Sequence, residues 1–308
     1  MDKTATKISV VVCTYNGAGF LDEQLASILQ QDYPAMQVVI SDDCSTDNTW
    51  DGLVAWQAQY PGVIEMYRQP ENLGYNKNFA FALSKVKGDY VALCDQDDIW
   101  YPHKLATLVR YAVNNPDMDM LHHDESELGK DTSLSVVDGN RWLPYEGSGC
   151  GILFVYNRLT GHKMFFKKRL LEHILPIPDG IVYDWWINVV VGINGKTLHV
   201  PEALMAYRLH AGSAYFSDVK KQIANVTVPL RHALRHFDVL PNMSARDRYF
   251  VSHFLKYYER HTPQRFDARL FLFLLRNRYF LYRDYYVKGG KLQREIFIIR
   301  LCRAFSKW

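Results

Sequence analysis

The sequence predicts an α/β fold: a mixed, mostly parallel, Rossmann-like sheet flanked by helices, with an α-helical C-terminal region. Apolar runs rich in β-branched residues alternate with helical patterns over roughly the first 120 residues. Strand–helix–strand repeats of this kind build parallel strands with helices on both faces. From residue 218 the pattern is helical to the end. We therefore expect two parts, residues 1–215 and residues 216–308.

The clearest strand is Ile8–Cys13 (ISVVVC), because a continuous β-branched run is typical of a strand buried on both faces. Further strands are expected at residues 38–41, 63–67, 90–94 and 118–121. The intervening helices are expected at residues 20–31, 46–60, 75–85 and 102–115. The middle of the chain is less regular, with strands expected at 152–156, 163–166, 197–200 and 204–209 and helices at 168–174 and 184–193.

Composition bounds the class of protein. The chain has 308 residues, of which 48% are hydrophobic, so it has ample material for a core. Disordered and collagen-like classes are excluded. The net charge is only +3, which argues against a strongly basic nucleic-acid-binding protein. This charge is uneven, because residues 265–308 hold 11 basic and 3 acidic residues (+8), which leaves −5 for the rest.

The sequence predicts no disulfide framework, signal peptide or spanning helix. The five cysteines are scattered without a CxxC pair, so no disulfide framework is predicted. The start MDKTATKIS is polar, unlike a signal peptide, and no apolar stretch reaches the ~18–20 residues of a spanning helix. We expect a reducing, cytoplasmic setting.

Polar side chains follow the predicted strands where each strand ends, the edge at which open α/β sheets bind ligands. The sharpest cluster is Asp95-Gln96-Asp97-Asp98. Three carboxylates so close repel one another, and Mg2+ or Mn2+ with its oxygen ligands would relieve that repulsion. The alternative is a solvated acidic turn that caps the next helix. No GxGxxG and no GxxxxGK[ST] occurs, so neither a dinucleotide fingerprint nor a P-loop is supported.

Asp42 and Asp43 end the second predicted strand. A carboxylate there could accept a hydrogen bond from a nucleobase imide, or it could serve as a charge at a helix N-terminus. Tyr15, in the first loop, could stack on the same base or pack within its loop.

Several ordered segments carry a family resemblance. VVVCTYNG, ISDDCSTDNT, ENLGYNKNF and LCDQDDIWYPHKL together resemble the family 2 glycosyltransferases of the GT-A fold. The later TGHKMFF and YDWW…YRLH segments resemble the bacterial rhamnosyltransferase-like branch of that family. The resemblance covers about residues 7–212.

The resemblance implies a nucleotide-sugar site and a metal site. In it, Asp97 is the principal metal ligand, with Asp95 beside it and His210 as a further ligand; the alternative for His210 is an ordinary polar loop residue. Residues implied to contact the nucleotide sugar are Thr14, Tyr15, Asn16, Asp42, Asp43, Asn72, Lys77, Asn78, Asp95, Gln96, Asp98 and Arg208.

The resemblance also implies an acceptor side. Asp184 matches the family's general base, which takes the proton of the acceptor hydroxyl during inverting transfer. Its alternative is an acid in the first turn of a helix. Tyr183 stands where the family often has His. The other residues implied on the acceptor side are Asp124, Thr160, Gly161, Trp185 and Trp186.

The tail at residues 265–308 interleaves 11 aromatic residues with arginines. Such a composition suits a helix on an anionic membrane surface, and the alternatives are packing on the body or a dimer interface.

The resemblance implies a metal-dependent inverting glycosyltransferase that moves L-rhamnose from dTDP-rhamnose to a polyprenyl-diphosphate-linked glycan of a bacterial surface polysaccharide. Such an enzyme would sit peripherally at the inner face of the cell membrane. Alternatives are a UDP-hexose or UDP-N-acetylhexosamine donor, or a non-catalytic membrane-associated assembly protein. No nucleic acid is expected, and the oligomeric state stays open.

Overall fold

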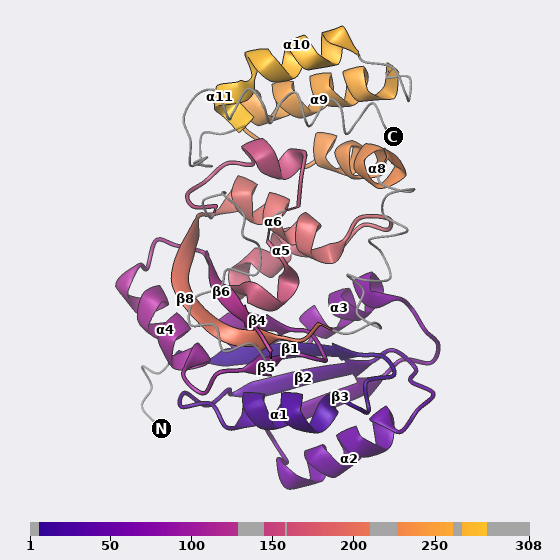
Figure 1. The fold of residues 1–308 in the computed structure, drawn as a ribbon, viewed down its shortest axis with the longest axis vertical. Coiled ribbons are helices and arrows are strands. Elements are labelled where there is room, and N and C mark those ends of the chain that lie inside the picture. Colours follow the sequence, from indigo (N-terminus) through magenta and orange to yellow (C-terminus); the bar gives the residue numbers. More distant parts are fainter. Residues whose placement is uncertain (1–5, 129–144, 158, 210–226, 261–266, 282–308) are drawn as a thin grey trace.

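A computed structural model describes residues 6–128, 145–157, 159–209, 227–260 and 267–281. Its centre is an eight-stranded sheet in the order β3-β2-β1-β4-β7-β6-β8-β5. Helices α1 and α2 lie below the sheet in Figure 1, α3, α5 and α6 lie above it, and α8 to α11 stack on α6 at the top.

The first half of the sheet is parallel, as predicted. β1 (Ile8–Thr14) pairs with both β2 (Gln37–Asp42) and β4 (Tyr90–Cys94), and β2 pairs with β3 (Ile64–Arg68). The connecting helices are α1 (Leu21–Leu29), α2 (Thr49–Gln59) and α3 (Tyr75–Leu83). The register places Thr14 opposite Asp42, so the polar residues after β1, β2 and β4 meet at one edge.

The second half of the sheet is mixed. β7 (Met164–Lys167) is antiparallel to β4 and to β6 (Met120–Glu127), while β8 (Thr197–Tyr207) runs parallel to β6. The short β5 (Ile99–Trp100) pairs antiparallel with β8, and α4 (Lys104–Asn114) follows it. The mixed, mostly parallel sheet flanked by helices is thus confirmed.

Three details of the middle of the chain differ from prediction. The strand expected at 152–156 is a 3-10 helix, η1 (Gly151–Phe154), because a short, wholly buried apolar run has no period that separates strand from helix. The strands expected at 197–200 and 204–209 form the single strand β8. The two-residue β5 was not predicted. The other elements here are η2 (Gly161–Lys163), η3 (Lys168–Leu170), α5 (Leu171–Ile174) and α6 (Tyr183–Asn194).

Two hydrophobic clusters cover the two faces of the sheet. Alternate residues of β1 enter different clusters, Val10 and Val12 on the face of α1 and α4, and Val11 on the face of α3 and α6. The side chains of Val10, Val11 and Val12 are fully buried, which explains why the strand sequence is apolar here.

The C-terminal helices α8 (Thr227–Asp238), α9 (Ala245–Arg260), α10 (Ala268–Arg276) and α11 (Arg278–Leu281) extend the cluster of α6. Phe237 of α8 contacts the rings of Trp185 and Trp186, and Phe250 of α9 contacts Phe154 and Phe273. The predicted boundary at residues 215–216 lies outside the described residues. Within the described part of the chain, none of the helices has the length and apolar character needed to cross a membrane.

Candidate active site

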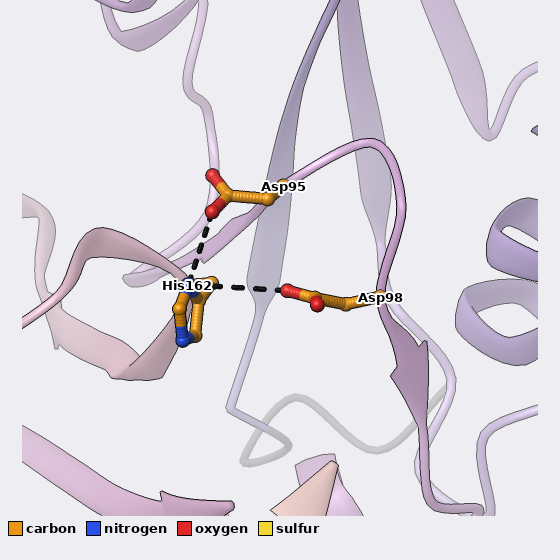
Figure 2. A group of neighbouring side chains, drawn as sticks. All are labelled: Asp95, Asp98 and His162. Carbon is orange, nitrogen blue, oxygen red and sulfur yellow. Dashed lines mark hydrogen bonds and ion pairs between the residues drawn. The ribbon is translucent and has the colours of Figure 1, made fainter. Parts of the chain in front are cut away.

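The acidic segment after β4 is bent so that its carboxylates face a histidine from another part of the chain. The pairing of β7 with β4 carries the preceding turn η2 to the same edge, and His162 of that turn faces Asp95 and Asp98 (Figure 2). His162 Nδ1 lies 3.0 Å from Asp95 Oδ2 and 3.9 Å from Asp98 Oδ2. Residues 67 positions apart in the sequence therefore form one cluster.

Asp98 differs from Asp95 and His162 in having a fully buried side chain without hydrogen bonds among the described residues. Its side chain is fully buried, and neither carboxylate oxygen accepts a hydrogen bond from the described residues. Burial raises the pKa of Asp98 above the usual range of an aspartate, and His162 opposes that rise. A buried carboxylate without hydrogen bonds is costly, so the site favours a nearby positive charge.

His162 is held from behind by Glu125 of β6, whose Oε2 lies 2.7 Å from His162 Nε2. Glu125 also accepts a hydrogen bond of 3.2 Å from Lys163. Burial alone would lower the pKa of His162, but Asp98, Asp95 and Glu125 outweigh it and raise the pKa. The ring is therefore fixed between carboxylates on both of its nitrogens.

A buried lysine supports the same turn. Lys104, at the start of α4, donates a hydrogen bond of 3.2 Å to the His162 carbonyl, and its ammonium lies 3.9 Å from the centre of the Trp100 ring. Burial lowers the pKa of Lys104 to about 8, although Asp98 and Glu125 favour its charged form.

The first loop is tied to the acidic segment through Gln96. Its Oε1 accepts from the Tyr15 N–H at 2.8 Å, and its amide donates to the Tyr15 carbonyl. The Tyr15 ring is 45% exposed, as a stacking residue requires. Asn16 has a left-handed backbone, and its side chain accepts from the Thr46 N–H, so it joins the first loop to the start of α2.

The aspartates after β2 have separate surroundings. Asp42 is fully buried and accepts from the hydroxyls of Thr14 and Ser45, which joins the ends of β1 and β2. Asp43 accepts from the N–H groups of Leu73 and Gly74 at 2.8 and 2.9 Å. Asp43 thus holds the loop before α3, and its remaining lone pairs are the ones available to a ligand.

Three predicted nucleotide-side residues lie around α3. Asn72 is exposed and accepts from the Gly74 N–H, and Lys77 forms an exposed ion pair of 3.8 Å with Asp179. Asn78 is buried and exchanges hydrogen bonds with Ser41 of β2. The Asn78 side chain thus joins α3 to β2.

Asp184 lies in the first turn of α6 and is 8% exposed. Asn157 donates a hydrogen bond of 2.8 Å to Asp184 Oδ1, and Asn188 donates one of 2.9 Å to Asn157 Oδ1. Burial raises the pKa of Asp184 to about 6; the charge of Asp95 adds to the rise and the hydrogen bond from Asn157 opposes it. The Asp95 effect indicates that Asp184 and the acidic segment share one site.

The predicted acceptor-side residues separate into two groups. Thr160 and Gly161 adjoin the cluster, since Thr160 Oγ1 lies 3.2 Å from His162 Nε2 and a Cβ on Gly161 would lie 2.1 Å from the Tyr183 hydroxyl. The indoles of Trp185 and Trp186 are buried, donate to backbone carbonyls and contact Phe237 of α8.

Asp124 and Arg208 are engaged within the protein. Asp124 Oδ1 lies 3.0 Å from His199 Nε2. Arg208 donates to the Asp97 carbonyl at 2.9 Å and pairs with Glu23 of α1. His210 lies outside the described residues.

Sequence reasoning missed His162, Glu125 and Asn157 as site residues. These residues lie in the TGHKMFF and neighbouring segments. Only the antiparallel pairing of β7 with β4 and β6 brings those segments to the acidic segment.

The cluster meets a simple test for a divalent cation. One ligand atom each from Asp95, Asp98 and His162 lie within 4.8 Å of one another, and Asp98 brings oxygens without hydrogen bonds. Carboxylate oxygen and imidazole nitrogen suit Mn2+, and Mg2+ would favour the carboxylates. The residues present therefore fit the metal that the sequence predicts.

The sheet, with its acidic segment at the carboxyl edge, defines a GT-A glycosyltransferase fold. Residues 9–175 match the model of "Glycosyl transferase family 2", so the chain belongs to that family. Among curated relatives, it is 28% identical over 210 residues to the dTDP-rhamnosyl transferase RfbG of Shigella flexneri, covering 65% of this chain and 71% of that one. An uncharacterized protein of Mycobacterium tuberculosis is 27% identical over 222 residues, or 68% of this chain, and the match spans 61% of the relative's length.

Solved structures agree on the fold. Staphylococcus aureus TarS 1–349 in complex with UDP-GlcNAc has a TM-score of 0.63 at 15% identity, covering 98% of this chain and 88% of that one. The mannosyltransferase PcManGT from Pyrobaculum calidifontis in complex with GDP-Man and Mn2+ has a TM-score of 0.60 at 18% identity, covering 99% and 84%.

Proposed function

We propose that the protein is a metal-dependent inverting glycosyltransferase that uses a nucleotide-diphosphate sugar. Two observations carry this proposal: Asp184 is a buried acid whose pKa burial raises to about 6, and Asp95, Asp98 and His162 form a group that could hold a cation. Inverting transfer requires that pairing, because one group takes a proton from the acceptor while the other side of the site holds the diphosphate.

The chain's own residues divide the work. Asp184 accepts the proton of the attacking hydroxyl, and Asn157 orients the carboxylate by donating a hydrogen bond to its Oδ1. Tyr15 offers an exposed ring on which the nucleobase stacks. Asp43 holds the loop before α3 on the nucleotide side of the site. A divalent cation, when bound, neutralises charge on the leaving diphosphate.

For the donor we propose dTDP-L-rhamnose, with a lipid-linked glycan of a bacterial surface polysaccharide as the acceptor. The support is the similarity to RfbG, a dTDP-rhamnosyl transferase. UDP-N-acetylhexosamine and GDP-mannose enter the test as rivals because structural neighbours were solved with UDP-GlcNAc and GDP-Man.

The test is a panel of nucleotide sugars incubated with purified protein, Mn2+ and a polyprenyl-diphosphate glycan, with release of nucleotide diphosphate as the readout. We expect release from dTDP-rhamnose and none from Asp184→Asn under the same conditions. Release from a UDP-sugar alone would overturn the donor. No release from any donor would overturn the enzyme and favour a non-catalytic assembly protein.

We further propose that the basic tail holds the protein against the inner, anionic face of the cell membrane. The support is the +8 charge of residues 265–308. Leu270, Phe273 and Leu274 of α10 are buried against the body, so its removal would expose the core. The test is therefore truncation after Leu281, which keeps every described helix. We expect loss of binding to phosphatidylglycerol-containing vesicles; unchanged binding would refute a tail anchor.

A further inference from the structure

The start of α6, the helix that carries Asp184, is capped by a residue from another helix. Val182, the residue before α6, has an apolar side chain and gives the helix no side-chain cap. The first N–H groups of a helix have no carbonyl partner within it and need another acceptor. Asp184 is the second residue of α6, so the position of its carboxylate depends on how this helix start is held.

Asn76 of α3 supplies the missing acceptor. Its Oδ1 accepts from the Tyr183 N–H at 2.9 Å, and its Nδ2 donates to the Ile181 carbonyl at 2.6 Å. The N–H requires an oxygen and the carbonyl requires a donor, so only one orientation of the amide satisfies both groups. One half-buried side chain thus holds the backbone on both sides of Val182, directly before Asp184.

Aromatic packing beside Asn76 strengthens the same contact. Phe79 of α3 stacks on the Tyr183 ring, with 4.0 Å between ring centres and 15° between ring planes. Tyr75, at the start of α3, meets the same ring edge-on at 6.4 Å between centres. The ring of Tyr183 is buried in this contact, and Asn76 adds the hydrogen bonds to the backbone.

The other end of this connection is the loop on the nucleotide side of the site. Asp43 accepts from the N–H groups of Leu73 and Gly74, and Gly74 is the residue before α3. Asn76 follows two residues later. The loop that Asp43 holds and the side chain that holds α6 therefore belong to one short segment.

We propose that Asn76 is a positioning residue, which fixes the start of α6, and with it Asp184, to the loop on the nucleotide side. This inference rests on the proposed function, in which Asp184 takes the proton of the acceptor. Asn76 acts through the backbone of residues 181–183 and takes no part in the proton transfer. Such positioning matters because a misplacement of about 1 Å in a reacting group can cost about 100-fold in rate.

The first measurement is hydrogen exchange of the Tyr183 amide in the full-length protein, without donor or acceptor. We expect exchange about 2- to 10-fold faster in Asn76→Ala than in the wild type, as for the loss of one net hydrogen bond. Asn194→Ala is the control, because Asn194 lies at the other end of α6 and bonds there to the Val190 carbonyl and to Asn242. Unchanged exchange in Asn76→Ala, or equal acceleration in both variants, would overturn the proposal.

The second measurement is steady-state kinetics with the donor that the nucleotide-sugar panel identifies, expressed per folded molecule. We expect kcat of Asn76→Ala to fall about 10- to 100-fold, with the KM for the donor changed less than about three-fold. Asn194→Ala should keep both values. A rise in KM with an unchanged kcat would overturn the proposal, since it would mean that Asn76 serves donor binding alone.

The two measurements separate a failure of the inference from a failure of the proposed function. The exchange measurement contains no donor. A silent panel together with faster Tyr183 exchange in Asn76→Ala would therefore reject the reaction and leave Asn76 as the residue that fixes the start of α6. Transfer that Asn76→Ala leaves unchanged would keep the reaction and reject Asn76 as a positioning residue.

Discussion

Replacing Asn157 by alanine tests how the fold sets the proton affinity of the proposed base. The Asn157 amide donates to Asp184 at 2.8 Å and is itself oriented by Asn188. A hydrogen bond to the ionised carboxylate favours that form and lowers its pKa. Asn157→Ala therefore raises the pKa of Asp184 above its starting value of about 6.

The size of the shift follows from the bond that is lost. A hydrogen bond to a charged group contributes about 1.5–3 kcal/mol, and water entering the space left by the amide restores part of it. A net loss of about 1.4 kcal/mol raises the pKa by roughly one unit, to about 7. The base must be ionised to act, so activity is lost as pH falls. At pH 6 the ionised fraction then drops about five-fold, whereas at pH 8 it hardly changes.

The assay is kcat/KM for nucleotide diphosphate release between about pH 5 and pH 9, which reports the pKa of the free enzyme. Asn194→Ala is the control, because Asn194 lies at the end of α6, the helix of Asp184, and its side chain bonds to the Val190 carbonyl and to Asn242 instead of to Asp184. We expect the acidic limb to move to higher pH in Asn157→Ala and to stay in place in Asn194→Ala. A uniform loss at every pH would refute the reasoning, since it would mean that Asn157 supports the fold without tuning Asp184.

Three further predictions concern single side chains. Asp184→Asn should abolish transfer while leaving calorimetric affinity for the nucleotide diphosphate within about two-fold, and a large loss of affinity would argue that Asp184 holds the donor. Gly161→Ala should lower the free energy of unfolding by about 1–3 kcal/mol in urea titration, because its Cβ would meet the buried Tyr183 hydroxyl at 2.1 Å. Gly19→Ala, where a Cβ meets nothing within 4 Å, serves as its control, and equal stability of the two variants would contradict the steric argument. Asp43→Asn should weaken nucleotide binding about 10-fold, because the amide has one acceptor oxygen and its NH2 group cannot accept the second N–H of the loop before α3; unchanged binding would show that the loop keeps its shape without the charge.

The parallel half of the fold could be predicted because each strand is a buried run and each helix an amphipathic segment. Val10 and Val12 face one hydrophobic cluster and Val11 faces the other. A strand buried on both faces in this way is apolar at every position. The same physics placed Asp42 and Asp95 at one edge, since the carboxyl ends of parallel strands coincide.

The histidine in the cluster could not be predicted in this way. His162 reaches Asp95 through the antiparallel strand β7, and Glu125 reaches His162 through β6, pairings that no local period encodes. Ile152 shows the same limit at the level of an element, because its apolar run is equally consistent with a strand and with the 3-10 helix that forms.

The candidate metal cluster and the proposed base are linked by charge. Asp95 raises the pKa of Asp184, so an acidic segment without a cation keeps the proton on the base more firmly. A divalent cation held by Asp95 would oppose that influence and favour the ionised form of Asp184. In the proposed reaction, the ion that would neutralise the leaving diphosphate would therefore also favour the ionised proton acceptor. Without a cation, a larger fraction of Asp184 would stay protonated near its pKa of about 6, so this arrangement of charges would link the proposed proton transfer to metal binding.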